Sequence, residues 1–425
     1  MKPRPVMRIL ESSAQSRYLT AVCNRGATDL TGVEGEVRRI VNAVRRDGDR
    51  ALRRYASRWD GLLKGEALLV PEDELERAWE QTTPELRAAI KQAARNIRRY
   101  AEWQKPREWR REIQSGLTVG QIVLPLESVG CYVPGGRYPL LSSLLMTVIP
   151  AQVAGVKRIC VASPQPAKAT LAAARFAGVR EFYRVGGAQA IAALAFGTKD
   201  IPRVRKIVGP GNRYVTAAKK LVAFDCAIEF LAGPTEALII SENGDSRWIA
   251  TDLVAQAEHD SKALCIFITT SGELAKTVQQ LVQEHTRSNA VAARSLSSRG
   301  AILLVGSLEQ AVEMANRIAP EHLTLPANLP SKLAAKVRHA GAIFLDELTP
   351  QSAGDYVSGP SHVLPTGGMA RSRGGLGVFD FVRVVSCQQV SRPGILRIAR
   401  PGIALANAEG LPGHAEAFRA RYSHV

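Results

Sequence analysis

The chain has 425 residues, of which 46% are apolar and 22% charged, with a formal net charge of +17. This composition is typical of a globular protein with two or three domains and excludes a mainly disordered chain. No run approaches the roughly 18 to 20 apolar residues of a membrane span, and the N-terminus lacks the apolar block of a signal peptide, so we expect a cytoplasmic protein without a membrane partner.

The basic residues are concentrated in the first 110 residues, on predicted helices where they alternate with acidic and apolar positions. Aromatic residues are not interleaved with them in the way that stacks bases. We therefore interpret the charge as a solvated basic face that modestly attracts anionic cofactors, and we expect no nucleic-acid partner. The six cysteines are scattered, mostly among apolar neighbours, which predicts reduced core residues and leaves no well-placed thiol nucleophile.

The N-terminal part of the chain is predicted to be helical. Residues 1–24 show no clear period and are expected to form a short separate arm. In the ranges 34–59 and 72–103, apolar residues recur at spacings of three and four, as on one face of a helix. We therefore expect an Arg-rich helical segment before the first sheet.

After Gly116, short β-rich runs alternate with helical runs, which predicts a parallel sheet covered by helices. The expected strands are 119–126, 156–163, 181–185, 206–208 and 227–230. The expected helices lie near 140–154, 167–177, 188–196 and 213–223.

The alternation then starts again, which suggests a second α/β unit and an internal duplication. Its expected strands are 237–241, 263–270, 301–306, 322–325 and 342–345, with helices near 246–260, 273–287, 308–318 and 330–339. Past residue 378 the pattern weakens into a tail that ends in a short helix within 404–422. Because this tail is long and partly apolar, we expect it to pack on something, such as a second subunit.

Gln256 and His259 are the first candidates for chemistry. They end an apolar helical run, and a spacing of three places them on one face of that helix. Zinc binds about four N, O or S ligands. The pair is therefore half of a metal site, and other parts of the chain must supply the rest.

Three glycine-containing loops, 132–139, 185–190 and 209–214, join predicted strands to predicted helices. Glycine lets the backbone approach a ligand, and a helix N-terminus offers free N–H groups to a phosphate. Each loop alone is explained equally well by a tight turn, but three at the carboxyl ends of successive strands favour a ligand site. The dinucleotide motif G-x-G-x-x-G is absent, so a nucleotide would bind in another manner.

Other polar residues stand in settings where a scaffold can aim them. Asp355 and His362 lie in the turn-rich stretch 352–366. Glu321 and His322 are adjacent and can act as two acid/base groups on one reacting centre, although alone they also fit a proline-terminated helix with two solvated side chains. His414 in the tail, taken alone, is expected to face solvent.

Together these stretches resemble the histidinol dehydrogenase family over roughly residues 35–420. The motifs follow in the family's order: YVPGG, GGAQA, GPGN, AGPTE, QAEHD, APEHL, GDY…HVLPT and EGL..H. So many unlinked motifs in sequence make the resemblance highly specific.

The resemblance implies a role for individual residues. It implies one zinc ion per subunit, held by Gln256, His259, Asp355 and His414. The implied substrate-binding residues are Thr235, Gln256, His259, His322, Asp355, His362, Glu409 and His414. Glu321 and His322 match the catalytic acid/base pair, and the NAD-contacting positions match Tyr132, Gln189 and Asn212.

The implied activity is the oxidation of L-histidinol through L-histidinal to L-histidine, the last steps of histidine synthesis, with two NAD+. His322 would take the hydroxyl proton, Glu321 would activate water to hydrate the aldehyde, and zinc would orient the substrate.

The implied fold is α/β, with two related incomplete Rossmann-like domains with parallel sheets and small N- and C-terminal segments, in a homodimer with shared active sites. The expected segments are an arm (1–24), a domain with the zinc and acid/base residues (25–107 plus 236–377), a domain with the NAD loops (108–235) and a tail for the neighbouring subunit's site (378–425).

Several positions differ from the family pattern: Thr235 and Ser361 replace serine and asparagine, and the runs 367–377 and 383–385 are atypical. They border the expected substrate pocket, so a same-fold dehydrogenase for another small amino- or sulfo-alcohol is an alternative. Retention of Glu409, suited to an ammonium group, favours histidinol. A zinc hydrolase is a more distant alternative, for which the three glycine loops have no role, and an RNA-binding protein would make the catalytic motifs coincidental.

Overall fold

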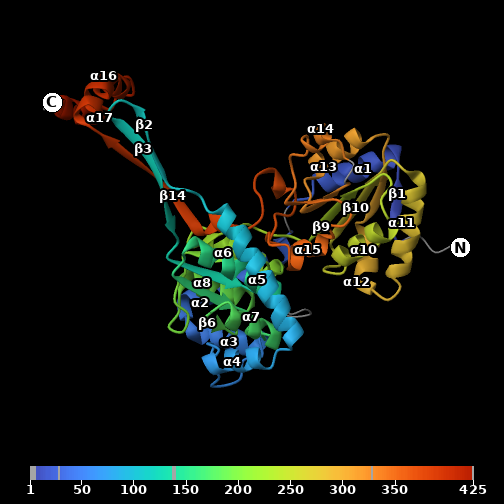
Figure 1. Cartoon of the computed structure of the whole chain (residues 1–425). Helices are drawn as coiled ribbons and strands as arrows, with labels where there is room; N and C mark the ends of the chain where they lie inside the picture. The colour runs from blue at the N-terminus through green and yellow to red at the C-terminus, as the bar shows by residue number, and fades with distance from the viewer. Residues whose placement is uncertain (1–5, 27–28, 136–139, 327–328, 424–425) are drawn as a thin grey trace.

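The computed structural model describes residues 6–26, 29–135, 140–326 and 329–423. The described chain forms two lobes, each built around a parallel sheet, and an arm that projects from one of them (Figure 1). Within these ranges, no helix combines the length and apolarity needed to cross a bilayer.

The six-stranded lobe has the strand order β1-β11-β10-β9-β12-β13, and all neighbouring strands run parallel. Its central strands are buried on both faces, as helix-covered parallel strands are. The strands are β1 (Arg8–Leu10), β9 (Glu236–Ile240), β10 (Leu264–Thr269), β11 (Ala301–Leu304), β12 (His322–Leu325) and β13 (Ala342–Leu345). The helices are α1 (Ser12–Cys23), α10 (Ser246–Ala257), α11 (Gly272–His285), α12 (Ala290–Ser298), α13 (Leu308–Ile318), α14 (Ser331–Ala334) and α15 (Gln351–Tyr356).

The five-stranded lobe has the order β6-β5-β4-β7-β8, again all parallel. Helix α6 is almost wholly buried because nearly all of its residues are apolar or small. The strands are β4 (Ser128–Tyr132), β5 (Arg158–Ala162), β6 (Glu181–Tyr183), β7 (Lys206–Val208) and β8 (Ala227–Ile228). The helices are α2 (Thr31–Asp47), α3 (Asp49–Trp59), α4 (Glu72–Glu80), α5 (Pro84–Gln104), α6 (Leu141–Ala154), α7 (Lys168–Phe176), α8 (Gly187–Phe196) and α9 (Arg213–Val222).

The arm is a three-stranded antiparallel sheet in the order β14-β3-β2, which carries two helices at its far end (Figure 1). Its elements are β2 (Trp109–Gln114), β3 (Leu117–Pro125), β14 (Val382–Val390), α16 (Arg392–Ala408) and α17 (Pro412–Tyr422). Two short 3₁₀ turns, η1 (Met369–Arg371) and η2 (Val378–Phe381), precede β14. Helices α16 and α17 pack on each other, so the tip is a small helical hairpin on a long ribbon.

The α/β class and the two parallel sheets predicted from the sequence are confirmed, but three segments are placed differently. Residues 119–126 were expected to open the first parallel sheet, whereas β3 belongs to the arm and β4 opens that sheet. The described residues 6–24 form no separate arm, because β1 pairs with β11. Helices α2 to α5 pack on the five-stranded sheet, whereas 25–107 were expected to group with 236–377. The apolar face of an amphipathic helix does not specify which sheet it covers, so the sequence pattern could not separate these arrangements.

Candidate active site

The predicted acid/base pair lies at the start of β12, in the interior of the six-stranded sheet. Glu321 and His322 are 6% and 3% exposed. The carboxylate Oε2 of Glu321 accepts a hydrogen bond from the hydroxyl of Thr235 and another from the backbone N–H of Glu236, both at 2.8 Å. Burial raises the pKa of Glu321 to about 7, because removal from water disfavours the charged form. A carboxyl with this pKa can exchange protons near neutral pH.

His322 is held from two sides. Its Nδ1 lies 3.1 Å from the carbonyl oxygen of Glu236, which can only accept, so Nδ1 carries a proton. Its Nε2 lies 3.8 Å from Oδ1 of Asp355, and its ring stacks on Phe344. Burial alone would lower the pKa of His322, but the carboxylates of Glu321 and Asp355 raise it to about 9. The Nε2 atom is therefore the position from which this imidazole exchanges protons.

Two of the predicted metal ligands meet beside this pair. The Gln256 amide, on α10, donates from Nε2 to Oδ2 of Asp355, on α15, over 3.2 Å. Its Oε1 lies 3.2 Å from the hydroxyl of Thr235. His259 follows one turn after Gln256, just past the end of α10, and is exposed. Burial would raise the pKa of Asp355, but His322 and nearby histidines, His259 included, give a net lowering.

His362 also joins this group. Its Nδ1 donates to the backbone oxygen of Asp355 at 2.9 Å, and its Nε2 lies 2.8 Å from the hydroxyl of Ser143 on α6. Burial lowers the pKa of His362, since the imidazolium is poorly solvated there. No sequence pattern had pointed to Ser143, a serine inside an apolar helix. His362 thus links the two lobes at the edge of the site.

The remaining two residues predicted to bind the substrate or the metal, Glu409 and His414, lie away from this group. Both are exposed on the helical tip of the arm, which points away from the lobes (Figure 1). Within the described ranges, no group of three or more His, Cys, Asp or Glu side chains is assembled for a metal ion. An amide oxygen, a carboxylate and an imidazole are donors that suit zinc, so Gln256, Asp355 and His259 fit a zinc site that needs one further ligand.

The three predicted cofactor residues line one pocket at the carboxyl edge of the five-stranded sheet. The pocket has a volume of about 360 Å³ and is lined by Glu36, Ile40, Trp59, Asp60, Tyr132, Gly135, Pro164, Gln165, Gly187, Ala188, Gln189, Asn212 and Tyr214. Residues 136–139 of the first glycine loop lie outside the described residues. The structure therefore brings together the described parts of all three loops, as expected for the carboxyl ends of parallel strands.

Local hydrogen bonds set the shape of this pocket. The Tyr132 hydroxyl accepts from the backbone N–H of Gly187, and Gln189 donates to Asp60 at 2.9 Å. Asn212 caps α9, since its side-chain oxygen accepts from the first backbone N–H groups of that helix. Asp60 was missed by the sequence reasoning, because a single aspartate at the end of a helix carries no recognisable signal.

Gly209 shows why the third loop needs glycine. Its φ of +116° is strained for other residues, and an added Cβ would lie 2.0 Å from the carbonyl oxygen of Tyr132. The buried side chains of Lys219 and Glu229 bond to the carbonyl and N–H of Gly209 and to each other. The backbone of this loop is thus pressed against the strand that carries Tyr132.

A loop-lined pocket on one parallel sheet and a buried Glu–His pair on the other suit a two-lobed α/β oxidoreductase. The family model for histidinol dehydrogenase matches residues 23–422, and the chain belongs to that family. Its relatives include the histidinol dehydrogenases of Aquifex aeolicus, 47% identical over 95% of this chain and 96% of the relative, and of Methanothermobacter thermautotrophicus, 43% identical over 95% and 97%.

A solved structure supports the fold over the whole chain. The crystal structure of histidinol dehydrogenase from Elizabethkingia anophelis superposes with a TM-score of 0.94 at 31% identity and covers 99% of both chains. The protruding arm is therefore included in the match, because so complete a coverage leaves no room to omit it.

Proposed function

We propose that this chain oxidises L-histidinol through L-histidinal to L-histidine, with two NAD+ reduced in succession. Family membership supports this activity. The observation that carries the proposal is the buried pair of Glu321 and His322, which lies directly against Gln256 and Asp355. Proton-exchanging groups beside a set of metal-capable donors are what a substrate alcohol needs for orientation and deprotonation.

His322 is proposed to act as the base in both oxidation steps. Its Nε2 takes the hydroxyl proton while the carbon loses a hydride to the nicotinamide ring, which converts the alcohol to the aldehyde. Glu321 then removes a proton from a water molecule that adds to the aldehyde carbon, while the proton held by Nε2 of His322 passes to the carbonyl oxygen. This forms the hydrate and returns His322 to its neutral form. His322 takes a hydroxyl proton of the hydrate as the second hydride leaves, and the carboxylic acid results. No thiol is used, consistent with the buried positions of Cys131, Cys160, Cys226 and Cys265.

The proposed zinc site consists of Gln256, His259, Asp355 and His414, one ion per subunit. When bound there, zinc would supply a positive centre that anchors the imidazole and amino nitrogens of the substrate. Thr235 and His362 border this position, because the Thr235 hydroxyl lies within hydrogen-bond distance of both Gln256 and Glu321, and His362 bonds to Asp355. Glu409 is proposed to bind the substrate ammonium group by charge.

NAD is proposed to bind in the pocket lined by Tyr132, Gln189 and Asn212. The Tyr132 and Gln189 side chains are already held by Gly187 and Asp60, so little ordering is needed when a ligand enters.

A homodimer with shared sites is proposed from the arm. His414 and Glu409 are exposed on its tip, while Gln256 and Asp355 lie beside His322 in the six-stranded lobe. The arm also exposes apolar side chains such as Ile113, Leu396 and Leu405, which are 66%, 48% and 67% exposed. Burial of these side chains against a second copy would favour association and bring His414 to the neighbour's site.

The test is the stoichiometry of NADH release. Zinc-loaded protein should release two equivalents of NADH per L-histidinol, and a chelator should abolish the reaction and remove the metal measured by atomic emission. A panel of other amino-alcohols and sulfonated diols serves as the comparison. Faster turnover of any of them, with no NADH from L-histidinol, would refute the substrate assignment.

A further inference from the structure

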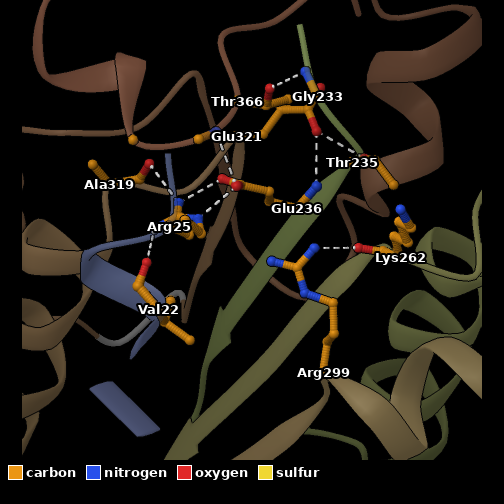
Figure 2. Close-up of polar contacts among 12 residues, drawn as sticks. Val22, Arg25, Gly233, Thr235, Glu236, Lys262, Arg299, Ala319, Glu321 and Thr366 are labelled. Carbon is orange, nitrogen blue, oxygen red and sulfur yellow. Dashed lines mark hydrogen bonds and ion pairs between the residues drawn. The ribbon is translucent and has the colours of Figure 1, made fainter. Parts of the chain in front are cut away.

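The chain passes between the lobes in three segments, the first of which includes residues 27–28, outside the described residues. The first follows α1 and leads to α2, the second leads from β8 into β9, and the third runs from α15 through η1 to η2. Glu236, at the boundary of the second segment, bonds to Arg25 of the first and to Gly367 of the third. Figure 2 shows the contact between Arg25 and Glu236.

Glu236 is the centre of this contact. Its carboxylate receives two hydrogen bonds from the guanidinium of Arg25, at 2.6 and 2.7 Å, and a third from the backbone N–H of Gly367 at 3.0 Å. The side chains of Arg25 and Glu236 are 6% and 5% exposed. The backbone N–H of Gly233 also donates to the hydroxyl of Thr366, which ties the second and third segments once more. A bidentate pair of this kind fixes direction as well as distance.

The backbone of Glu236 bonds to both proposed acid/base residues. Its N–H donates to Oε2 of Glu321, and its carbonyl accepts from Nδ1 of His322. A shift of this one peptide would therefore move both hydrogen bonds at once. The contacts that hold the Glu236 carboxylate therefore also influence the orientation of Glu321 and His322, because both sets of hydrogen bonds are made by the same residue.

Arg25 reaches the same pair by a second route. Its guanidinium donates to the carbonyl of Ala319 at 3.4 Å, and to that of Val22 at 2.8 Å. Ala319 has a φ of +51°, an uncommon conformation for a residue other than glycine, and it turns the chain from α13 toward β12. The contact with Arg25 helps to hold this turn two residues before Glu321.

We propose that Arg25 and Glu236 are positioning residues for the oxidation: the ion pair pins the three connections between the lobes and, through the backbone of Glu236, sets the geometry of Glu321 and His322. The inference rests on the proposed roles of Glu321 and His322. Neither Arg25 nor the Glu236 side chain is placed against the substrate, so their effect is on turnover rather than on binding.

The test uses the zinc-loaded full-length protein and four variants. Arg25→Met should lower kcat about 10- to 100-fold, while KM for L-histidinol and for NAD+ changes less than about threefold, because small misplacements of reacting groups act on turnover. Arg25→Lys should lie between this variant and the wild type, since lysine keeps the charge but loses the fork. Arg158→Lys is the control for Arg25→Lys, because Arg158 also forms a bidentate pair, with Glu181, but at the amino end of the strands of the five-stranded sheet, opposite the proposed NAD pocket. The kcat of this control should stay within about twofold of the wild type.

The double variant Arg25→Met with Glu236→Gln separates positioning from folding. It removes the unpaired buried charge, so its thermal midpoint should return toward that of the wild type while kcat stays at least about tenfold low. In both proteins that carry Arg25→Met, hydrogen exchange should be faster in peptides covering 230–237 and 319–325 than it is in Arg158→Lys. Recovery of turnover together with stability, or an equal loss in the control, would overturn the inference.

Glu321→Gln is measured in parallel. If it keeps full turnover, the proposed function of the acid/base pair fails. If it is impaired while Arg25→Met has wild-type kcat and exchange, only the positioning inference fails.

Discussion

Glu321→Gln is predicted to uncouple stability from activity. Glutamine has nearly the same shape and can still accept the hydrogen bonds from Thr235 and Glu236 through its amide oxygen. It cannot take a proton from water. The variant should therefore fold as the wild type does but fail in the step in which the aldehyde is hydrated.

The size of the stability effect follows from the pKa of Glu321, which burial raises from 4.5 to about 7. The folded state holds its proton more tightly, so this group stabilises the fold fully below the unfolded pKa and loses that contribution as pH rises through the folded pKa. A shift of this size corresponds to about 3 kcal/mol at most. The difference in free energy of unfolding, variant minus wild type, should therefore increase by up to about 3 kcal/mol between pH 4 and pH 8, because only the wild type loses stability over this range through Glu321.

Two assays check these expectations. Urea unfolding of both proteins at several pH values gives the stability difference, and stopped-flow NADH release from L-histidinol and from L-histidinal separates the two oxidations. Loss of a general base is expected to slow aldehyde oxidation about 10²- to 10⁴-fold and alcohol oxidation much less. Equal losses in both steps, or a stability difference that does not change with pH, would refute the reasoning.

Three further predictions concern the base, the shared site and the cofactor loop. His322→Asn should keep zinc content and NAD+ affinity but lower kcat. In the wild type, kcat/KM should rise with pH toward about 9, because the raised pKa of His322 means that its neutral, basic form appears only at higher pH. An unchanged kcat in the variant, or a flat wild-type profile from pH 6 to 9, would contradict its role as base. Mixed subunits of inactive His414→Ala and His322→Asn should regain partial activity, and no recovery despite proven subunit exchange would place each site within one chain. Gly209→Ala should raise KM for NAD+ and lower stability by about 1 to 3 kcal/mol, because its Cβ would meet the Tyr132 carbonyl; a calorimetric midpoint and KM equal to wild type would contradict this.

The sequence predicted the strands of both sheets well where they are short, apolar and bounded by glycine or proline. The ranges 206–208, 322–325 and 342–345 coincide with β7, β12 and β13. The prediction worked because a continuous apolar run between turn residues is typical of a buried parallel strand.

Prediction from the sequence was less successful where a strand pairs with one far away in the chain, and where proline and glycine occur inside a helix. The arm depends on pairing of β3 with β14, about 265 residues later, which local periodicity does not reveal. Helix α16 contains Pro401 and two glycines, so a helix in 392–408 was not expected. The candidate site shows the same division. The described parts of the three glycine loops meet at one pocket, as their places after successive strands predicted. Glu409 and His414 instead lie away from the other predicted site residues, and the contact of Arg25 with Glu236 has no signal in the local sequence.

The placement of β1 has a consequence for the biosynthesis of the chain. This strand leaves the ribosome early, but its partner β11 follows only about 290 residues later, which at about 5 to 20 residues per second means a wait of roughly 15 to 60 seconds. All strands of the five-stranded sheet are made in that interval, since β4 to β8 lie between residues 128 and 228. The six-stranded sheet, which carries Glu321 and His322, can therefore be completed only after every strand of the other parallel sheet has been synthesised.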